Sequence, residues 1–331
     1  MSKNLDSVNP GPFGSVVSNF AAVRKTTGTD LDAAGVKDFT APKAEEVGVS
    51  IMFGEGSVGK VRYAGLAYML DQEGVIDLQQ NAREFFLQPA VGKFLEKKYE
   101  GRGKELQSGI TNLFSGDASA ATLSDLTTHR SGIGDLTKDQ AKLIEERGVD
   151  FEFCAPDLLL IPEASRAIPC GANGHPKSQT HPDMPDAEYG AHQYSNLGYI
   201  VLGLAMEAAY DAAKNPHDVN TKKDYKQLTR DYMLHPIEGP AAGKGLAFDE
   251  TNFSEEIDPA SDVARVAWVE DGKFTDATQF SGANAAGGMF ASANDSTKFF
   301  EEFFRGFPGS PEYGEEGANK FFSSETILLM M

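Results

Sequence analysis

Residues 54–61 read GEGSVGKV, and two different kinds of functional site share this short stretch. One is a phosphate-binding loop, in which the pattern G-x-x-x-x-G-K is followed by Ser or Thr. The other is a Ser-x-x-Lys pair, in which Ser57 is a nucleophile and Lys60 is its base. Both interpretations use Lys60, but they predict unrelated folds and unrelated chemistry.

The phosphate-loop interpretation matches the glycines and the lysine but fails at the next position. Residue 61 is Val, which has no oxygen to ligate Mg²⁺ where the motif requires a hydroxyl. Asp71, the nearest candidate for a metal-binding carboxylate, lies within the helix that the loop would begin. The sequence also contains no N-K-x-D pattern for reading a base. A nucleotide-binding protein is therefore the third alternative.

The Ser-x-x-Lys interpretation depends on a helix that begins at Ser57 and ends near Gly74. Residues at i and i+3 lie on one face of a helix, so the Lys60 amine can reach the Ser57 hydroxyl. A free lysine, with a pKa of about 10.4, is a poor base at neutral pH, but burial lowers that pKa. Apolar residues fill most of 58–70, which predicts a largely buried helix. The competing interpretation is a helix-capping serine followed by a surface lysine.

Composition narrows the function classes. The chain has 331 residues, room for about two domains, and its formal net charge of −19 disfavours nucleic acid or an anionic membrane as a partner. The six histidines show no metal-ligand spacing, so we expect neither a metal site nor a cofactor. Cys154 and Cys170 are predicted to be reduced thiols, with a single bridge between them as the alternative.

Hydropathy predicts no membrane segment and no secretion signal. The chain contains no apolar run of about 18 residues, the length of a membrane span. Its first 20 residues, MSKNLDSVNPGPFGSVVSNF, lack the apolar core of a signal peptide. We therefore expect a cytoplasmic protein.

Local patterns divide the chain into a lead-in at 1–44 and a main domain at 45–331. The lead-in is expected to be loosely ordered, with one helix near 15–24, and the main domain to carry a loop-rich insertion at about 150–192. A short apolar run at 45–53 is expected to be extended. Further helices are predicted at 122–129, 196–213 and 292–304, and a strand or hairpin at 263–275.

Four phrases in order along the chain indicate a family. They are SVGKVRYAGLAYMLDQEGVIDL from 57, ATLSDLTTHRSGIGD from 121, HQYSNLGYIVLGLAMEAA from 192 and AAGGMFASANDSTKFF from 285. This arrangement resembles the superfamily of serine β-lactamases, penicillin-binding proteins and esterases, especially its class C β-lactamase-related branch. The resemblance implies an α+β, β-lactamase-like fold: a mostly helical domain with an antiparallel sheet.

The resemblance also implies catalytic roles. Ser57 would be the acylated nucleophile, and Lys60 and Tyr194 would move protons, since a phenolate beside an ammonium is a workable base. Asn196 would hydrogen-bond the substrate or Lys60. The alternative for the Tyr194 segment is a loop tyrosine followed by a helix cap at Ser195 or Asn196.

Two further features of the phrases are interpreted structurally. Gly287 and Gly288 are expected on the substrate-binding side of the site, where they shape a tight passage of the backbone. His129 belongs to a structural phrase of the family, and we expect a structural histidine there rather than a base.

The chain departs from the family after Asp295. No Lys or His followed by x-Gly appears there, although the family carries this motif on a strand that also supplies an oxyanion-hole donor. Such a donor is worth about 10² to 10³ in rate. The KTTG at 25–28 precedes the nucleophile and is interpreted as coincidence. The sheet is therefore expected to be incomplete, whether the chain is a fragment, a divergent member or completed by a partner.

These observations predict a serine hydrolase or acyltransferase that acts on a small-molecule ester or amide through an acyl-enzyme at Ser57. An esterase or transesterase is favoured over an antibiotic-resistance enzyme, because no signal peptide is predicted. The alternative is a non-catalytic binding or scaffold protein of the same fold. The oligomeric state is left open.

Overall fold

The computed structural model describes most of the main domain and short pieces elsewhere. It describes residues 50–135, 192–214, 223–257, 284–308 and 319–330, single positions at 190, 263, 310 and 315, and the backbone of strands at 20–24, 31–35, 267–270 and 273–276. The predicted insertion at 150–192 lies almost entirely outside these residues, and so do Cys154 and Cys170.

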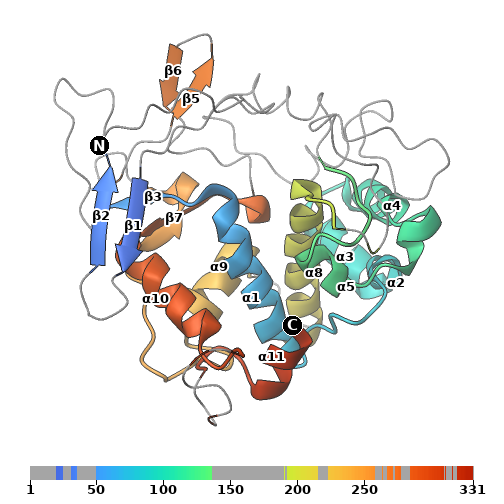
Figure 1. Cartoon of the computed structure of the whole chain (residues 1–331). Coiled ribbons are helices and arrows are strands. Elements are labelled where there is room, and N and C mark those ends of the chain that lie inside the picture. The colour runs from blue at the N-terminus through green and yellow to red at the C-terminus, as the bar shows by residue number, and fades with distance from the viewer. Residues whose placement is uncertain are drawn as a thin grey trace.

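Two long helices form the centre of the described structure. Helix α1 (Gly59–Gln72) packs against helix α8 (Asn196–Lys214), as Figure 1 shows. Both are buried around most of their circumference, and α8 is buried at every residue from Leu197 to Tyr210. The prediction of a largely buried helix after Ser57 is therefore confirmed.

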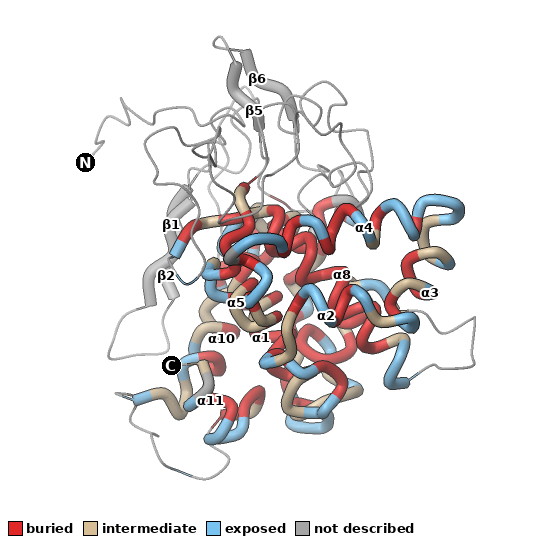
Figure 2. The backbone as a smooth tube through the Cα atoms, turned by 90° about the vertical axis from the view of Figure 1, so that its right-hand side faces the viewer, coloured by how far each residue is buried: buried red, intermediate tan, exposed pale blue. Residues whose placement is uncertain are grey.

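Shorter helices cover this pair, and their outer faces carry the exposed residues (Figure 2). Local signals begin several of them: the side chains of Asn81 and Thr122 cap two N-termini, and Pro89 opens a third. Within the described residues, no helix is long and apolar enough to cross a membrane. The helices are α2 (Ala82–Leu87), α3 (Pro89–Lys98), α4 (Gly103–Leu113), α5 (Leu123–Thr127), α9 (Tyr225–Thr229), α10 (Ala293–Phe304) and α11 (Ser324–Met330).

A small antiparallel sheet lies at one end of α1. Its order is β3 (Met52–Gly54), β7 (Met289–Ser292) and β4 (Thr251–Phe253), so β7 is the central strand, and all of its residues are buried. Ala291 pairs with Phe53 on one side and with Thr251 on the other. Residues 52 and 53 of the apolar run before Ser57 lie in β3, which leads to the nucleophile turn, and residues 45–49 of that run lie outside the described residues. The sheet and the helices together form the α+β architecture that the sequence predicts.

Two hairpins form separate two-stranded sheets. The hairpin predicted at 263–275 is confirmed by β5 (Ala267–Glu270) and β6 (Lys273–Asp276). The helix predicted near 15–24 is wrong over Phe20–Arg24, which forms β1 and pairs with β2 (Leu31–Gly35). A short isolated helix gains too few hydrogen bonds to offset its nucleation cost, whereas the β2 partner supplies backbone bonds along the whole strand.

Helix α10 begins where its sequence predicts. The Ser292 hydroxyl accepts a hydrogen bond from the Asp295 backbone N–H at 3.0 Å, which satisfies a donor at the helix start. Phe299 and Phe303 are buried, whereas Phe304 is 53% exposed. The Phe299 ring contacts Arg62 of α1 and lies in an aromatic cluster with Phe248, Phe303 and Phe321. Helix α10 therefore packs against α1, the helix that carries Lys60.

Candidate active site

Ser57 lies in a tight turn between β3 and α1. This single turn of 3-10 helix, η1 (Gly56–Val58), begins with Gly56 at a φ of 53°, a conformation that favours glycine. The N–H of Glu55 donates to the Met289 carbonyl at 2.9 Å and so ties the turn to the central strand. Val58, expected in the buried helix, is instead 50% exposed because it precedes α1. Ser57 itself is exposed and available to a substrate.

Lys60 points into the protein and not to the surface. It is only 4% exposed, and its Nζ donates to Ser57 Oγ at 3.2 Å, to Asn196 Oδ1 at 2.8 Å and to the Ala286 carbonyl. The same nitrogen lies 4.9 Å from the centre of the Tyr194 ring. The surface-lysine interpretation is therefore wrong. A phosphate loop does not fit either, because this amine is committed to the interior.

Burial makes Lys60 a usable base. Desolvation lowers its pKa to about 7, although the negative charge of Asp135 opposes part of that shift. A neutral amine has two N–H donors and one lone pair. When the donors bind Asn196 Oδ1 and the Ala286 carbonyl, the lone pair is left to face Ser57 Oγ. The geometry and the pKa thus both suit proton transfer from serine to lysine.

Tyr194 completes the contact with the nucleophile. Its hydroxyl oxygen lies 2.5 Å from Ser57 Oγ and 3.1 Å from Asn196 Oδ1. Burial raises the pKa of Tyr194, so a phenol is favoured over a phenolate. The expected pair was a phenolate beside an ammonium. Burial instead favours the neutral form of both groups, since it lowers the pKa of the amine to about 7 and raises the pKa of Tyr194, which keeps a proton to donate.

The start of α8 is held by the turn that follows α5. Asn196 donates its backbone N–H to Asp135 Oδ1 at 2.8 Å and its side-chain Nδ2 to Asp135 Oδ2 at 3.2 Å. Ser195 Oγ accepts from the Gly198 N–H at 2.9 Å, so the helix-cap alternative is correct for Ser195. Sequence reasoning missed Asp135. Its only signal was its place at the end of the THRSGIGD phrase.

His129 supports Tyr194 from the same turn. Its carbonyl accepts from the Gln193 N–H at 2.7 Å and its Nδ1 from the Ser195 N–H at 3.1 Å, so it bonds both residues that flank Tyr194. Its ring lies 4.6 Å from the Tyr194 ring. Burial, followed by the charge of Lys60, lowers the pKa of His129 to about 4, which keeps it neutral. These contacts agree with the structural role that the sequence predicts.

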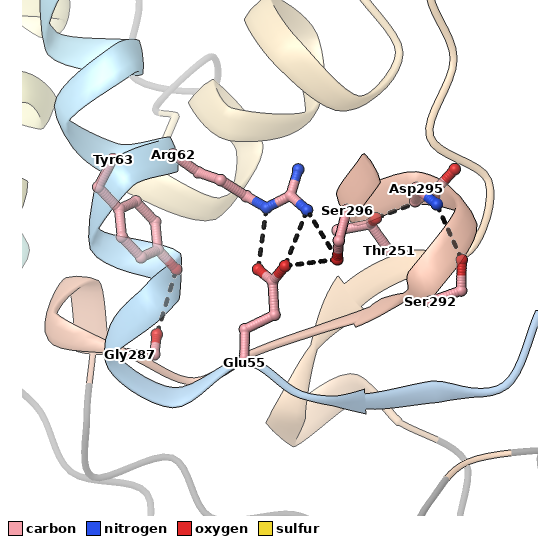
Figure 3. Close-up of polar contacts among 8 residues, drawn as sticks. All are labelled: Glu55, Arg62, Tyr63, Thr251, Gly287, Ser292, Asp295 and Ser296. Carbon is pink, nitrogen blue, oxygen red and sulfur yellow. Dashed lines mark hydrogen bonds and ion pairs between the residues drawn. The ribbon is translucent and has the colours of Figure 1, made fainter. Parts of the chain in front are cut away.

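Gly287 and Gly288 connect the site to the central strand. They follow Ala286, whose carbonyl receives the Lys60 bond, and precede β7. The Gly287 carbonyl accepts from the Tyr63 hydroxyl at 3.3 Å (Figure 3), and Gly288 takes a φ of 75°. Both glycines thus lie where the backbone turns tightly beside Lys60. Their contact with a substrate stays a prediction.

A buried ion pair lies behind the nucleophile turn (Figure 3). Arg62 Nε and Nη2 each donate to one carboxylate oxygen of Glu55 at 2.9 Å, and the Ser296 hydroxyl donates to Glu55 at 2.8 Å. The Arg62 guanidinium also stacks over Phe299 at 4.3 Å. This contact joins the turn, α1 and α10, and the sequence did not reveal it because each charge alone resembles an ordinary surface residue.

In the part of the chain that the structure describes, no three His, Cys, Asp or Glu side chains lie close enough to hold a metal ion. The expectations of no metal and no cofactor stay predictions.

Comparison with known proteins identifies the family. The family model described as Beta-lactamase matches residues 14–324. This chain belongs to the Beta-lactamase family. The resemblance inferred from the four sequence phrases is therefore confirmed, and the match also includes the β1–β2 hairpin. No curated protein matches the sequence closely enough to count as a relative.

Solved structures show the same fold at low sequence identity. An octameric penicillin-binding protein homologue from Pyrococcus abyssi has a TM-score of 0.55 at 19% identity, over 93% of this chain and 54% of its own. The D-amino acid amidase from Ochrobactrum anthropi SV3, complexed with L-phenylalanine, has a TM-score of 0.51 at 18% identity, over 86% of this chain and 63% of its own. The chain thus spans less than two thirds of the length of either structure.

Proposed function

We propose that this Beta-lactamase family member is a serine hydrolase that acts on a small-molecule ester or amide through an acyl-enzyme at Ser57. Family membership supports serine hydrolase chemistry in general. The observation that carries the specific assignment is the convergence of Lys60 Nζ and Tyr194 Oη on Ser57 Oγ, at 3.2 and 2.5 Å. Lys60 lies in the first turn of α1, and Tyr194 lies two residues before α8, far away in the sequence.

Acylation uses the neutral amine first. Lys60 accepts the Ser57 proton as Ser57 Oγ attacks the carbonyl carbon, and a tetrahedral intermediate forms. The bond to the leaving group then breaks, and Tyr194 donates its proton to the departing nitrogen or oxygen. The Lys60 ammonium, whose nitrogen lies 4.9 Å from the centre of the Tyr194 ring, then gives the proton that it took to the Tyr194 phenolate, so the amine is neutral and Tyr194 is a phenol again.

Deacylation repeats the scheme with an incoming nucleophile. Water, activated by the Lys60 amine, gives hydrolysis, whereas an acceptor alcohol gives acyl transfer. The D-amino acid amidase structures hold L-phenylalanine amide in one complex and D-phenylalanine in another, which suggests amides as well as esters for the first substrate screen. A cytoplasmic location, no metal and no cofactor are part of this proposal.

Covalent labelling tests the proposal. The protein is incubated with a fluorophosphonate, and the modified peptide is identified by mass spectrometry. We expect a label on Ser57 that disappears in Ser57→Ala, together with hydrolysis of p-nitrophenyl butyrate or of a D- or L-phenylalanine amide. Labelling only at other residues, with the same rate in Ser57→Ala, would contradict a Ser57 acyl-enzyme.

The alternative is a non-catalytic binding protein of the same fold. Residues 296–331 carry no Lys-x-Gly or His-x-Gly motif, which the family resemblance places on a strand that supplies part of the oxyanion hole. A folded protein that is not labelled at Ser57 and hydrolyses none of the three substrates would support this alternative.

A further inference from the structure

A buried carboxylate lies directly behind the proton-transfer groups. Asp135 is 6% exposed, and its two oxygens accept the two N–H groups of a single residue, the backbone N–H and the side-chain Nδ2 of Asn196, at 2.8 and 3.2 Å. A carboxylate oxygen can only accept a hydrogen bond. The nitrogen end of the Asn196 amide must therefore face Asp135.

The orientation of the Asn196 amide determines which of its atoms faces the active site. With Nδ2 turned to Asp135, Oδ1 faces the site and accepts from Lys60 Nζ at 2.8 Å and from Tyr194 Oη at 3.1 Å. If the amide turned over, Nδ2 would instead donate to the Lys60 lone pair. The lone pair would then no longer face Ser57, and the base would be lost without any change in residue type.

We propose that Asp135 is a positioning residue for acyl transfer: it holds the Asn196 amide in the one orientation that directs the Lys60 lone pair at Ser57. The proposal deepens the proposed function and rests on it for its kinetic readout only. Of the two contacts expected for Asn196, the one with Lys60 is present, and contact with a substrate stays a prediction.

The negative charge of Asp135 predicts the direction in which the pKa of Lys60 changes when Asp135 is replaced. The groups that act on Lys60 are Tyr199 from α8, Tyr194 from the segment just before α8, and His129 and Asp135 from the turn that follows α5. Of these, Asp135 is the one that raises the pKa of Lys60. Removing its charge lowers that pKa further. A site that merely loosened and took up water would move the pKa the other way, toward the ordinary 10.5.

The isosteric change Asp135→Asn is the main variant. It removes the charge and sets an NH₂ group against Asn196 Nδ2, so one of the two amides must turn over. We expect the maximal rate of fluorophosphonate labelling at Ser57 to fall on the order of 10²-fold, as for a misaligned catalytic group. The labelling rate is also measured against pH. The acid limb of this profile, where the rate falls as Lys60 becomes protonated, should move to lower pH. The matched control is Asp249→Asn, at a carboxylate that is 81% exposed, and it should change neither value.

A double-mutant cycle tests whether Asp135 acts through Asn196. In an Asn196→Ala background there is no amide to orient, so adding Asp135→Asn should cost almost nothing in maximal rate while the acid limb still shifts. Rate losses that multiply independently would overturn the proposal. A limb that moves to higher pH in Asp135→Asn would also overturn it.

A measurement without catalysis separates this inference from the proposed function. The pKa of Lys60 is followed by NMR on protein with ¹³C-labelled lysine, using Lys60→Met to assign the signal. We expect a value near 7 in the unmodified chain and a lower value in Asp135→Asn. An unchanged or higher value contradicts the role of Asp135, whether or not Ser57 is ever acylated. Absence of labelling in the unmodified chain contradicts only the proposed function.

A second measurement on the unmodified chain covers the case in which Asp135→Asn does not fold. The side-chain amide of Asn196 is observed by ¹⁵N NMR and assigned with Asn196→Asp. Its Nδ2 protons should exchange with solvent much more slowly than those of a solvated asparagine, because a buried carboxylate holds them. Exchange as fast as in a free amide would overturn the proposal.

Discussion

Lys60 shows at the scale of one residue how a common pattern becomes a chemical group. A lysine three residues after a serine is frequent in proteins, and most such amines stay charged in water. Here the side chain is 4% exposed, and desolvation lowers its pKa to about 7. The short pattern indicated the pair, but the burial that makes it reactive depends on α8 and on the loop before β7.

The pH dependence of Ser57 labelling follows from this pKa. Lys60 accepts a proton only when neutral, so the rate should rise with pH and level off above an inflection near 7. Lys60→Arg keeps the charge but cannot act as a base, and it should lower the plateau by a factor on the order of 10³. Labelling followed at a series of pH values gives the profile. A rate that falls as pH rises through 7 would contradict Lys60 as the base.

Buried contacts at the scale of elements hold the nucleophile turn in place. Glu55 and Arg62 lie on either side of Ser57 in sequence, and their side chains are 2% and 1% exposed. Because α10 adds Ser296 and Phe299 to the same contact, a strand edge, a turn and two helices meet there. The helices themselves were predictable from apolar spacing and caps. The contact between them was not, because it joins residues 55 and 296.

Breaking this ion pair should be costly. Arg62→Met leaves the Glu55 carboxylate buried without its partner, and we expect a loss of about 3 to 5 kcal/mol in the free energy of unfolding. Equilibrium unfolding in urea measures it. Glu105→Gln, in a surface pair with Arg102 in which both side chains are well exposed, serves as the control and should cost less than about 1 kcal/mol. Equal losses in the two variants would contradict a structural role for the buried pair.

Helices α3 and α4 approach each other closely at Gly103, and this contact gives a second prediction for stability. A Cβ on Gly103 would lie 2.2 Å from backbone atoms of Glu96, so Gly103→Ala must push the helices apart. We expect a loss of about 1 to 3 kcal/mol, measured in the same urea experiment. The matched control is Gly65→Ala in α1, where the nearest atom is 3.5 Å away and alanine should be neutral or stabilising. The reverse order of the two effects would contradict this packing.

Net charge acts on the whole molecule. The formal net charge is −19, so the acidic side chains repel one another, and they do so more strongly in the compact state than in the unfolded chain. Salt screens that repulsion. The screening length falls from about 30 Å at 0.01 M salt to about 8 Å at 0.15 M. We therefore expect the melting temperature to rise by a few degrees over this range of NaCl. Choline chloride should act equally, because screening does not depend on the identity of the cation. A lower melting temperature in both salts would contradict the expectation.

The sequence by itself determined the family and the main helices, and it proposed Ser57, Lys60 and Tyr194 as the central site residues. Four phrases in a fixed order were sufficient for the family, and the spacing of Ser57 and Lys60 placed both on one side of a helical start. These are local features, since helix periodicity, capping and motif spacing are set by neighbouring residues. The one helix that was wrong, over Phe20–Arg24, depended on a partner strand that local propensity does not include.

Only the tertiary structure decided how these residues are ionised and oriented. It brought Tyr194 within 2.5 Å of Ser57, turned the Lys60 amine inward and placed Asp135 behind Asn196. The reason is that desolvation and hydrogen-bond direction depend on which atoms surround a group, and those atoms come from segments far away in the chain. The serine and the lysine can therefore be identified from the sequence. A neutral lysine whose lone pair faces that serine is a property of the folded protein.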